Sequence, residues 1–329
     1  MVIPTHMQAV VHTAPATADQ LHIGVMPVPV PRADELLVRV RATALNRADI
    51  LQRRGLYPPP PGASAILGLE IVGEVVQACG TWQVGQRVMA VVTGGGYAEY
   101  CCVPAAEAMA VPDTVDDVQA AAIPEAFLTA WLNLITLGAL HPGESVFVHA
   151  GASGVGSMAI QLAQRWGARV YAAAGTPEKR QLCTTLGATH VCDSRNPPHA
   201  ETIKHATNGV GVDIVLDMLG APAWDDNTAM LSRGGRLLLV GLLAGAKAPI
   251  DLGVILGKSL TITGTTLRRT PAPTKVALVT AASTWLLPRL ARADIVAVVD
   301  STFPMVRVSE AHVRMETNAN AGKIVLVWP

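Results

Sequence analysis

The stretch VFVHAGASGVG, residues 146–156, decides the fold of this chain. Its first four residues, Val146–His149, form a short apolar run of β-prone residues, and they lead into the glycine-rich turn Gly151–Gly156. A helical pattern follows over Ser157–Trp166 and stops at Gly167. A strand, a glycine turn and a helix in immediate succession predict a phosphate-binding turn at the start of a doubly wound α/β sheet.

The composition of this turn suits a dinucleotide. Its backbone N–H groups must approach a pyrophosphate closely, and the following helix N-terminus adds a partial positive charge. The cofactor-binding residues predicted here are Gly151, Ala152, Ser153, Gly154, Val155 and Gly156. Ser153 replaces the middle glycine of the G-x-G-x-x-G pattern, so an ordinary strand–helix turn is the alternative. The strand before the turn and the helix after it favour the dinucleotide site.

Strands alternate with helices from about Ala120 onward. A helix is predicted from Thr176-Pro177 to Gly187, with threonine as its cap and proline at its first position. Further strands are predicted at Arg169–Ala173, His190–Asp193, Val212–Asp217, Arg236–Gly241 and Ser259–Gly264. Six strands with intervening helices are typical of a doubly wound parallel sheet.

The two ends of the chain lack this alternation of strands and helices. Short valine-bearing runs punctuated by turns predict an antiparallel β domain in the first third, with strands at Leu36–Arg41, Ile71–Val76, Arg87–Val91 and Ala98–Val103. Strands at Val296–Val299 and Lys323–Val327 are expected to rejoin that domain. We therefore expect a first part of the catalytic domain at 1–126, a Rossmann domain at 127–268, and a return to the catalytic domain at 269–329.

Composition excludes several classes of function. Half of the 329 residues are hydrophobic and 15% are charged, which is typical of a folded protein with a large core. Lys plus Arg equals Asp plus Glu, at 25 each, so no basic field attracts nucleic acid or a membrane surface. The start lacks a signal-peptide pattern, and the most apolar stretch, Leu237–Leu256, contains Lys247 and Asp251 and predicts a buried strand plus a loop. Five cysteines without a CxxC pair favour reduced thiols and a cytoplasmic location.

The end of the second Rossmann strand indicates which dinucleotide binds. An NAD site usually places an acid there for the ribose 2′-hydroxyl. This chain has Gly175 and Thr176 instead, with Lys179 one helical turn on and Arg195 after the third strand. A small neutral position with nearby cations favours NADPH, although Lys179 and Arg195 could also be solvated surface charges.

Five longer motifs carry a family resemblance: ALNRAD at 44–49, GLYPPPPG at 55–62, GLE at 68–70, AAIPEAFLTA at 121–130 and NAGKIVL at 320–326. With these motifs the chain resembles the zinc-free quinone oxidoreductase branch of the medium-chain dehydrogenase/reductase superfamily, and within it the p53-inducible group and its bacterial relatives. The resemblance implies a GroES-like β domain plus a Rossmann domain.

The same resemblance predicts an enzyme without zinc. Asn46 and Leu69 stand where the zinc-dependent relatives have a cysteine and a histidine, and neither replaces such a ligand. Without a metal to polarise an alcohol, an acceptor that is already activated is expected, such as a quinone or another conjugated carbonyl compound.

The resemblance also assigns roles to residues outside the turn. It implies that Asn46 contacts the nicotinamide or the acceptor oxygen, and that Tyr57 stacks on the acceptor or donates a proton. Their alternatives are a turn residue and a surface aromatic, and water is another candidate for the proton donor. Ser194 stands where close relatives have a tyrosine near the 2′-phosphate, which leaves the strength of the NADPH preference open. The other cofactor contacts expected are Thr129, Gly241, Leu242, Leu243, Thr266, Leu267 and Lys323.

These features together predict an NADPH:quinone reductase. An enone or enoyl reductase on the same scaffold is the nearest alternative, and a non-catalytic NADPH-binding sensor or structural protein is another. The last Rossmann strand, Ser259–Gly264, would leave an open sheet edge, so we expect a homodimer that pairs this edge across a two-fold axis.

Overall fold

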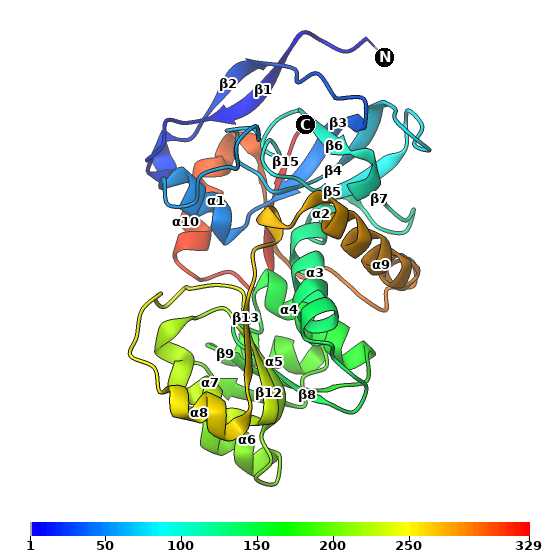
Figure 1. Cartoon of the computed structure of the whole chain (residues 1–329). Coiled ribbons are helices and arrows are strands. Elements are labelled where there is room, and N and C mark those ends of the chain that lie inside the picture. Colours follow the sequence, from blue (N-terminus) through cyan, green and yellow to red (C-terminus); the bar gives the residue numbers. More distant parts are fainter. Residues whose placement is uncertain (1) are drawn as a thin grey trace. The chain divides into compact units, whose positions relative to one another are not determined.

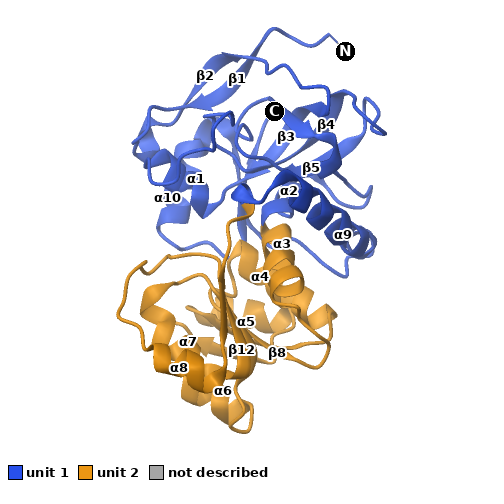
Figure 2. Ribbon diagram, viewed as in Figure 1, with its two compact units in different colours: residues 1–125, 268–329 blue, residues 126–267 orange. Residues whose placement is uncertain are grey.

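The structure, a computed structural model, describes residues 2–329 and divides into two compact units (Figure 2). Of the described residues, unit 1 comprises 2–125 and Arg268–Pro329, and unit 2 comprises Ala126–Leu267. The chain therefore leaves unit 1 once and returns to it. Each change of unit lies one residue before the boundary expected from the sequence.

Unit 2 is built on a sheet of six parallel strands in the order β10-β9-β8-β11-β12-β13, of which Figure 1 labels β8, β9, β12 and β13. Its strands are β8 (Ser145–Val148), β9 (Arg169–Ala174), β10 (His190–Asp193), β11 (Val212–Asp217), β12 (Leu231–Leu239) and β13 (Thr261–Gly264). The strand order reverses between β8 and β11. In open parallel sheets this reversal is where ligands bind, at the carboxyl ends of the strands.

Helices cover the sheet of unit 2, with α4 and α5 packed on β8, β9 and β10, and α7 and α8 on β12. Ser153 caps α4, which buries Met158, Ile160 and Leu162 on the sheet and stops before Gly167, whose φ of 93° favours glycine. The helical segments of this unit are α3 (Pro124–Trp131), which begins at the boundary, η3 (Leu132–Leu137), α4 (Gly154–Arg165), α5 (Pro177–Thr185), α6 (Ala200–Ala206), η4 (Ala221–Ala223), α7 (Trp224–Met230) and α8 (Leu252–Lys258).

Unit 1 is built on a seven-stranded sheet in the order β14-β15-β3-β4-β5-β7, in which β6 also pairs with β3. Most pairs are antiparallel, as predicted, but β14 and β15 run parallel. Strands β1 and β2 form a separate hairpin. The strands of this unit are β1 (His6–Val11), β2 (His22–Pro27), β3 (Glu35–Ala44), β4 (Glu70–Gln77), β5 (Arg87–Val91), β6 (Tyr100–Pro104), β7 (Met109–Ala110), β14 (Val299–Pro304) and β15 (Lys323–Val327).

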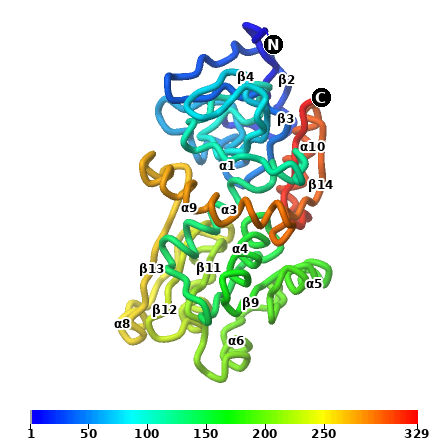
Figure 3. Tube along the Cα trace, turned by 90° about the vertical axis from the view of Figure 1, so that its right-hand side faces the viewer, coloured from blue at the N-terminus to red at the C-terminus, as the bar shows by residue number. Residues whose placement is uncertain are grey.

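Helix α10 packs on β14 and β15 of this sheet, and it lies beside β14 in the rotated view (Figure 3). A core of buried aliphatic side chains from β3, β4, β5, β15 and α10 lies between them. The helical segments of unit 1 are η1 (Ala18–Gln20), α1 (Arg47–Arg53), η2 (Ala105–Glu107), α2 (Asp117–Ala121), η5 (Leu267–Arg269), which begins at the boundary, α9 (Ala272–Ala291), η6 (Met305–Arg307) and α10 (Val308–Glu316).

The predicted fold class is confirmed, but two local predictions were wrong. The strand expected at Val296–Val299 starts only at Val299 and continues to Pro304, because its partner strand β15 begins at Lys323, which pairs with Val299. The stretch 237–256 was expected to be a buried strand plus a loop, yet its end forms α8, whose Asp251 cap accepts from Gly253 N. Within the described chain, no helix is both long and apolar enough to cross a membrane.

Candidate active site

The turn after β8 is shaped for a phosphate. Ser153 caps α4 by accepting a hydrogen bond from Gly156 N at 3.0 Å. A Cβ on Gly156 would lie 2.3 Å from Ala150 O, so this position takes only glycine. By helix geometry, the N–H groups of Gly154 and Val155 at the start of α4 have no partner within the helix. A close backbone approach and free N–H groups at a 12-residue helix are what a pyrophosphate requires.

The ends of β9 and β10 lie next to this turn. Gly151 N donates to Ala173 O at 2.9 Å, and Ser194 N donates to Ala174 O at 3.1 Å. Thr176 caps α5, where its Oγ1 accepts from Lys179 N at 3.3 Å. Gly175 has room for a ligand, since a Cβ there would meet Ser194 Oγ only at 3.6 Å. The structure thus brings Gly175, Thr176, Lys179 and Ser194 to one edge of unit 2.

Arg195 lies at the same edge, but it is held by an acid that the sequence reasoning overlooked. Its Nε and Nη2 donate to the two oxygens of Asp193 at 2.9 and 2.6 Å, and these hydrogen bonds hold the pKa of Asp193 well below its usual range. A second missed residue, Arg180, lies 3.0 Å from Asp193 and donates to Gly175 O at 2.8 Å. Its position one helical turn after Thr176 is the signal that could have identified it. This edge carries three cations, Lys179, Arg180 and Arg195, and two acids, Asp193 and Glu178, so one positive charge is in excess, which suits a phosphate ligand.

The remaining residues predicted for unit 2 lie around the same sheet or on α3. Thr129 is buried within α3, where its carbonyl accepts from Asn133 Nδ2 at 2.9 Å. Gly241, Leu242 and Leu243 follow the carboxyl end of β12, and the two leucines expose more than half of their surface. Thr266 is exposed after β13, whereas Leu267 is buried.

Unit 1 gathers a second polar group around Glu70, whose side chain is fully buried at the start of β4. Lys323 Nζ lies 2.7 Å from Glu70 Oε1, and Asn46 Nδ2 donates to the same oxygen at 2.8 Å. Lys323 also donates to Asn46 Oδ1 at 2.7 Å and to Leu45 O at 2.8 Å. All three ammonium protons are therefore used, so Lys323 holds Asn46 in place and has no donor left for the cofactor contact that was expected of it.

These bonds also limit what Asn46 can do. Its two amide protons point to Glu70 Oε1 and, at 3.3 Å, to Ala44 O. Its Oδ1 accepts from Lys323 and retains one lone pair. Asn46 can accept a hydrogen bond from a ligand, but it cannot donate one to an acceptor oxygen without breaking a bond that it has.

A network of buried hydrogen bonds holds the backbone at Asn46 in place. Asp49 accepts from Asn46 N at 2.7 Å and from Gly68 N at 3.0 Å, and burial raises its pKa to about 6. The Tyr97 hydroxyl bonds to Asp49 and also lies 3.3 Å from His312 Nε2. Since the Arg53 guanidinium only donates, and does so to His312 Nδ1 at 3.1 Å, the proton of this imidazole is assigned to Nε2. Burial lowers the pKa of His312 to about 3, so the ring stays neutral.

Tyr57 lies half-buried in its proline-rich loop, with the guanidinium of Arg268 5.3 Å from the centre of its ring. Arg268 is itself held by two bonds from Nε and Nη2 to Thr93 O, at 3.0 and 2.5 Å. A fixed cation over an aromatic face stabilises the ring's position. Tyr57 therefore belongs to unit 1, as do Asn46, Glu70 and Lys323.

The residues present do not fit a catalytic zinc ion. Asn46 supplies an amide that is already bonded on both sides, and Leu69 is packed in the interior. The ammonium of Lys323 lies between Asn46 and Glu70, where a second cation would be repelled. Among residues 2–329, no three His, Cys, Asp or Glu side chains group as metal ligands would.

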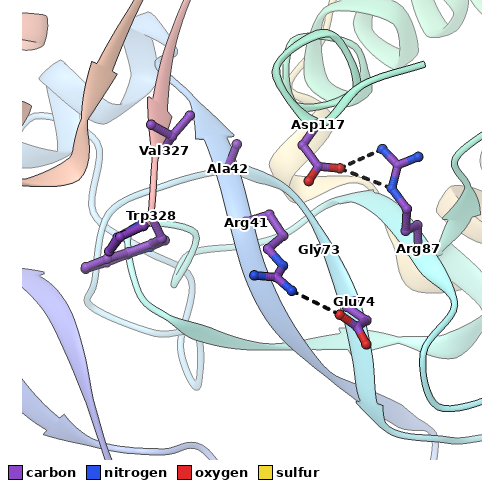
Figure 4. A pocket seen from close by; sticks show the side chains of 9 residues that line it. Arg41, Ala42, Gly73, Glu74, Arg87, Asp117, Val327 and Trp328 are labelled. Atoms are coloured by element: carbon purple, nitrogen blue, oxygen red, sulfur yellow. Dashed lines mark hydrogen bonds and ion pairs between the residues drawn. The ribbon is translucent and has the colours of Figure 1, made fainter. Parts of the chain in front are cut away.

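A separate cavity of about 420 Å³ opens on unit 1 beside β15 (Figure 4). Its charged side chains are paired already: Arg41 donates to Glu74 at 3.2 Å, and Arg87 donates to Asp117 at 2.6 Å. None of the predicted site residues lines it. The candidate active site is therefore not this cavity.

Comparison with known proteins assigns both units. A family model described as the alcohol dehydrogenase GroES-like domain matches residues 32–113, and one described as zinc-binding dehydrogenase matches residues 154–282. A component of the phenolphthiocerol/phthiocerol polyketide synthase of Mycobacterium tuberculosis is 37% identical over 69% of this chain. The chain spans about a tenth of the length of the curated relatives it matches.

Solved structures match over nearly the full length. The mycobacterial protein Rv1454c complexed with NADPH has 31% identity and a TM-score of 0.87, over 98% of this chain and 99% of that one. A mycobacterial quinone oxidoreductase has 30% identity and a TM-score of 0.85, over 98% and 99%. The CurK enoyl reductase has 27% identity and a TM-score of 0.87, over 99% and 100%.

Proposed function

Because the chain belongs to the medium-chain dehydrogenase/reductase superfamily, we propose that it reduces quinones with NADPH and without a metal ion. The observation that carries this proposal is the ammonium of Lys323 between Asn46 and Glu70. A site with this cation and no metal ligands cannot polarise an alcohol as zinc does. It suits an acceptor whose carbonyl groups are conjugated and already electron-poor.

The residues of unit 2 fit NADPH. The Gly151–Gly156 turn would hold the pyrophosphate, and Lys179, Arg180, Ser194 and Arg195 would surround the 2′-phosphate. When bound, NADPH supplies a hydride. The bonds from Arg195 to Asp193 support this assignment, because they hold the arginine in one orientation before any ligand arrives.

Steady-state turnover with an ortho-quinone tests the proposal, with loss of NADPH absorbance as the readout. We expect turnover with NADPH, and slower turnover with NADH. Tight NADPH binding without turnover of any quinone or enone would contradict an enzymatic function. It would favour the alternative of a non-catalytic NADPH-binding protein.

Reduction of enones or enoyl thioesters is the second candidate. It is supported by the likeness to a structure named as an enoyl reductase and to part of a polyketide synthase. A comparison of kcat/KM for a quinone and for an alkenal of similar size separates the two. A ratio above one favours the quinone reductase, and a ratio below one favours the enone reductase.

We also propose that the protein forms a homodimer. Strand β13 is an edge of the unit 2 sheet, and apolar side chains on and before α8 are exposed, at 50% for Ile250, 61% for Leu252 and 82% for Leu256. Pairing two such edges would cover both the free backbone groups and these side chains. Light scattering should give a dimer mass for the protein and a monomer mass for Leu256→Glu. A monomer mass for the unaltered protein at micromolar concentration would contradict the dimer.

Two finer predictions stay proposals. Membership of the p53-inducible group is a proposal that rests on the resemblance of the sequence motifs alone, because the structures that match include several kinds of reductase. A cytoplasmic location is supported by the five cysteines, all of which are free thiols.

A further inference from the structure

Glu125 holds an unusual position at the beginning of α3. Its backbone N–H donates to Glu70 Oε2 at 2.9 Å, on the side of that carboxylate opposite to Asn46 and Lys323. Its own carboxyl group is half-buried, and no hydrogen bond to that group from any residue in 2–329 is found. Glu125 thus presents an unused carboxyl group directly beside the Glu70 cluster.

The surroundings of this carboxyl favour its neutral form. Burial is the main cause that raises the pKa of Glu125 to about 8, and the negative charge of Glu70 adds to it. The charged and titratable groups that face it come from five elements and one loop: Glu70 on β4, Asp49 on α1, Lys323 on β15, Lys275 on α9, Arg268 on η5, and Tyr57 in its loop. The ammonium of Lys323 lowers the pKa of Glu125, but it is bonded to Glu70, and the pKa of Glu125 stays above that of an ordinary glutamate. At neutral pH Glu125 therefore keeps its proton.

We propose that Glu125 is the proton donor of the reduction, an inference that rests on the proposed function. The hydride brings an electron pair that forms a new bond at one end of the conjugated acceptor. The π electrons shift to the carbonyl oxygen at the other end, which takes the proton as the O–H bond of Glu125 breaks. The products are the reduced acceptor, NADP⁺ and the Glu125 carboxylate, and the carboxylate regains a proton from water.

Neither Asn46 nor Tyr57 fits this role as well. Both amide protons of Asn46 are committed to Glu70 and Ala44. Burial is the main cause that raises the pKa of the Tyr57 phenol from its usual value, the nearby cation Arg268 lowers it, and the charge of Glu125 raises it. General acid catalysis is most efficient when the pKa of the acid lies near the working pH, which favours the carboxyl group. Tyr57 is left to orient the acceptor by stacking and by a hydrogen bond.

The test replaces Glu125 by glutamine, which keeps the shape of the side chain but cannot supply the proton. Glu125→Gln should lower kcat by about 10²- to 10⁴-fold, the usual contribution of a general acid. In the unaltered protein kcat should fall as the pH rises through about 8, because the acid form is lost, and Glu125→Gln should lack this decline. Glu310→Gln, at an exposed position on α10, is the matched control and should behave like the unaltered protein.

A second readout does not depend on turnover. Carbon-13 NMR of glutamate-labelled protein without ligands should show one carboxyl group that titrates near pH 8, absent in Glu125→Gln and present in Glu310→Gln. An active protein in which Glu125→Gln keeps both its rate and its pH profile overturns the donor role alone, and so does a Glu125 that titrates as an ordinary acid. An unaltered protein that reduces neither quinone nor enone overturns the proposed function, and the donor role fails with it.

Discussion

In unit 2 the candidate cofactor site consists mainly of backbone groups, with free N–H groups at the start of α4 and room at Gly175, whereas unit 1 contributes polar side chains built around the ion pair of Glu70 and Lys323. In unit 1 Asn46, Glu70, Glu125 and Lys323 come from four separate parts of the chain and meet through hydrogen bonds of 2.7 to 2.9 Å. A binding site made of backbone groups tolerates most side-chain substitutions, but it is disrupted when one of its glycines is replaced. A buried charge cluster fails when one charge is removed, because its partner is left uncompensated.

The largest expected effect follows from removal of one charge in unit 1. Lys323→Met leaves the fully buried Glu70 without its cation, which should reduce the free energy of unfolding by about 3–5 kcal/mol. Denaturant unfolding followed by circular dichroism measures this loss. The double variant Glu70→Gln, Lys323→Met should recover part of it, and Lys204→Met, at a half-exposed position on α6, should change little. Equal stability of the two lysine variants would show that the cluster carries no such energy.

The second effect tests the backbone site of unit 2. Gly156→Ala places a Cβ where it meets Ala150 O, so the turn must shift and its N–H groups lose their alignment. We expect the NADPH dissociation constant to rise at least tenfold, about 1.4 kcal/mol, in a titration of nucleotide fluorescence. Gly257→Ala on α8 is the control, because a Cβ there meets nothing within 4 Å. Equal NADPH dissociation constants for the two variants would show that NADPH binding does not depend on the shape of the turn.

The two sites changed in these variants differ in how well they could be predicted from the sequence. The Gly151–Gly156 turn was predictable because strand, turn and helix are adjacent in the chain, and the structure has them where they were expected. Glu70 and Glu125 were not assigned roles, because their partners lie 24 to 253 positions away, in the bonds Asn46–Glu70, Glu125–Glu70 and Lys323–Glu70. Asp49 was not assigned one either, although its partners Asn46 and Gly68 lie only 3 and 19 positions away. A lone acid within the apolar run at 121–130 was the available signal, since such charges are rarely buried without a partner.

A smaller effect is expected from the cations near Gly175. Arg195→Gln removes one of the groups proposed to bind the 2′-phosphate, so kcat/KM for NADPH should fall about tenfold, equivalent to roughly 1.4 kcal/mol, while the value for NADH stays the same. Arg292→Gln, an exposed arginine that also pairs with a nearby acid, is the matched control. Equal losses of kcat/KM with NADPH and NADH would show that Arg195 does not bind the 2′-phosphate.

The smallest effect concerns Tyr57. Tyr57→Phe keeps the ring beneath Arg268 and loses one hydroxyl, which is worth about 0.5–1.5 kcal/mol as a hydrogen bond. We expect a rise of up to about tenfold in KM for the quinone, with the decline of kcat above pH 8 retained. If Tyr57→Phe instead abolishes that decline, the phenol and not the carboxyl group supplies the proton.

We propose that NADPH held by unit 2 reduces a conjugated carbonyl compound without a metal ion. A single-turnover stopped-flow measurement tests it most directly, with protein treated with a chelator, loaded with NADPH and mixed with an ortho-quinone or an enone. We expect rapid loss of NADPH absorbance with one equivalent of reduced acceptor, at the same rate before and after chelation. No loss of absorbance with either acceptor, or activity that returns only when zinc is added, would contradict it.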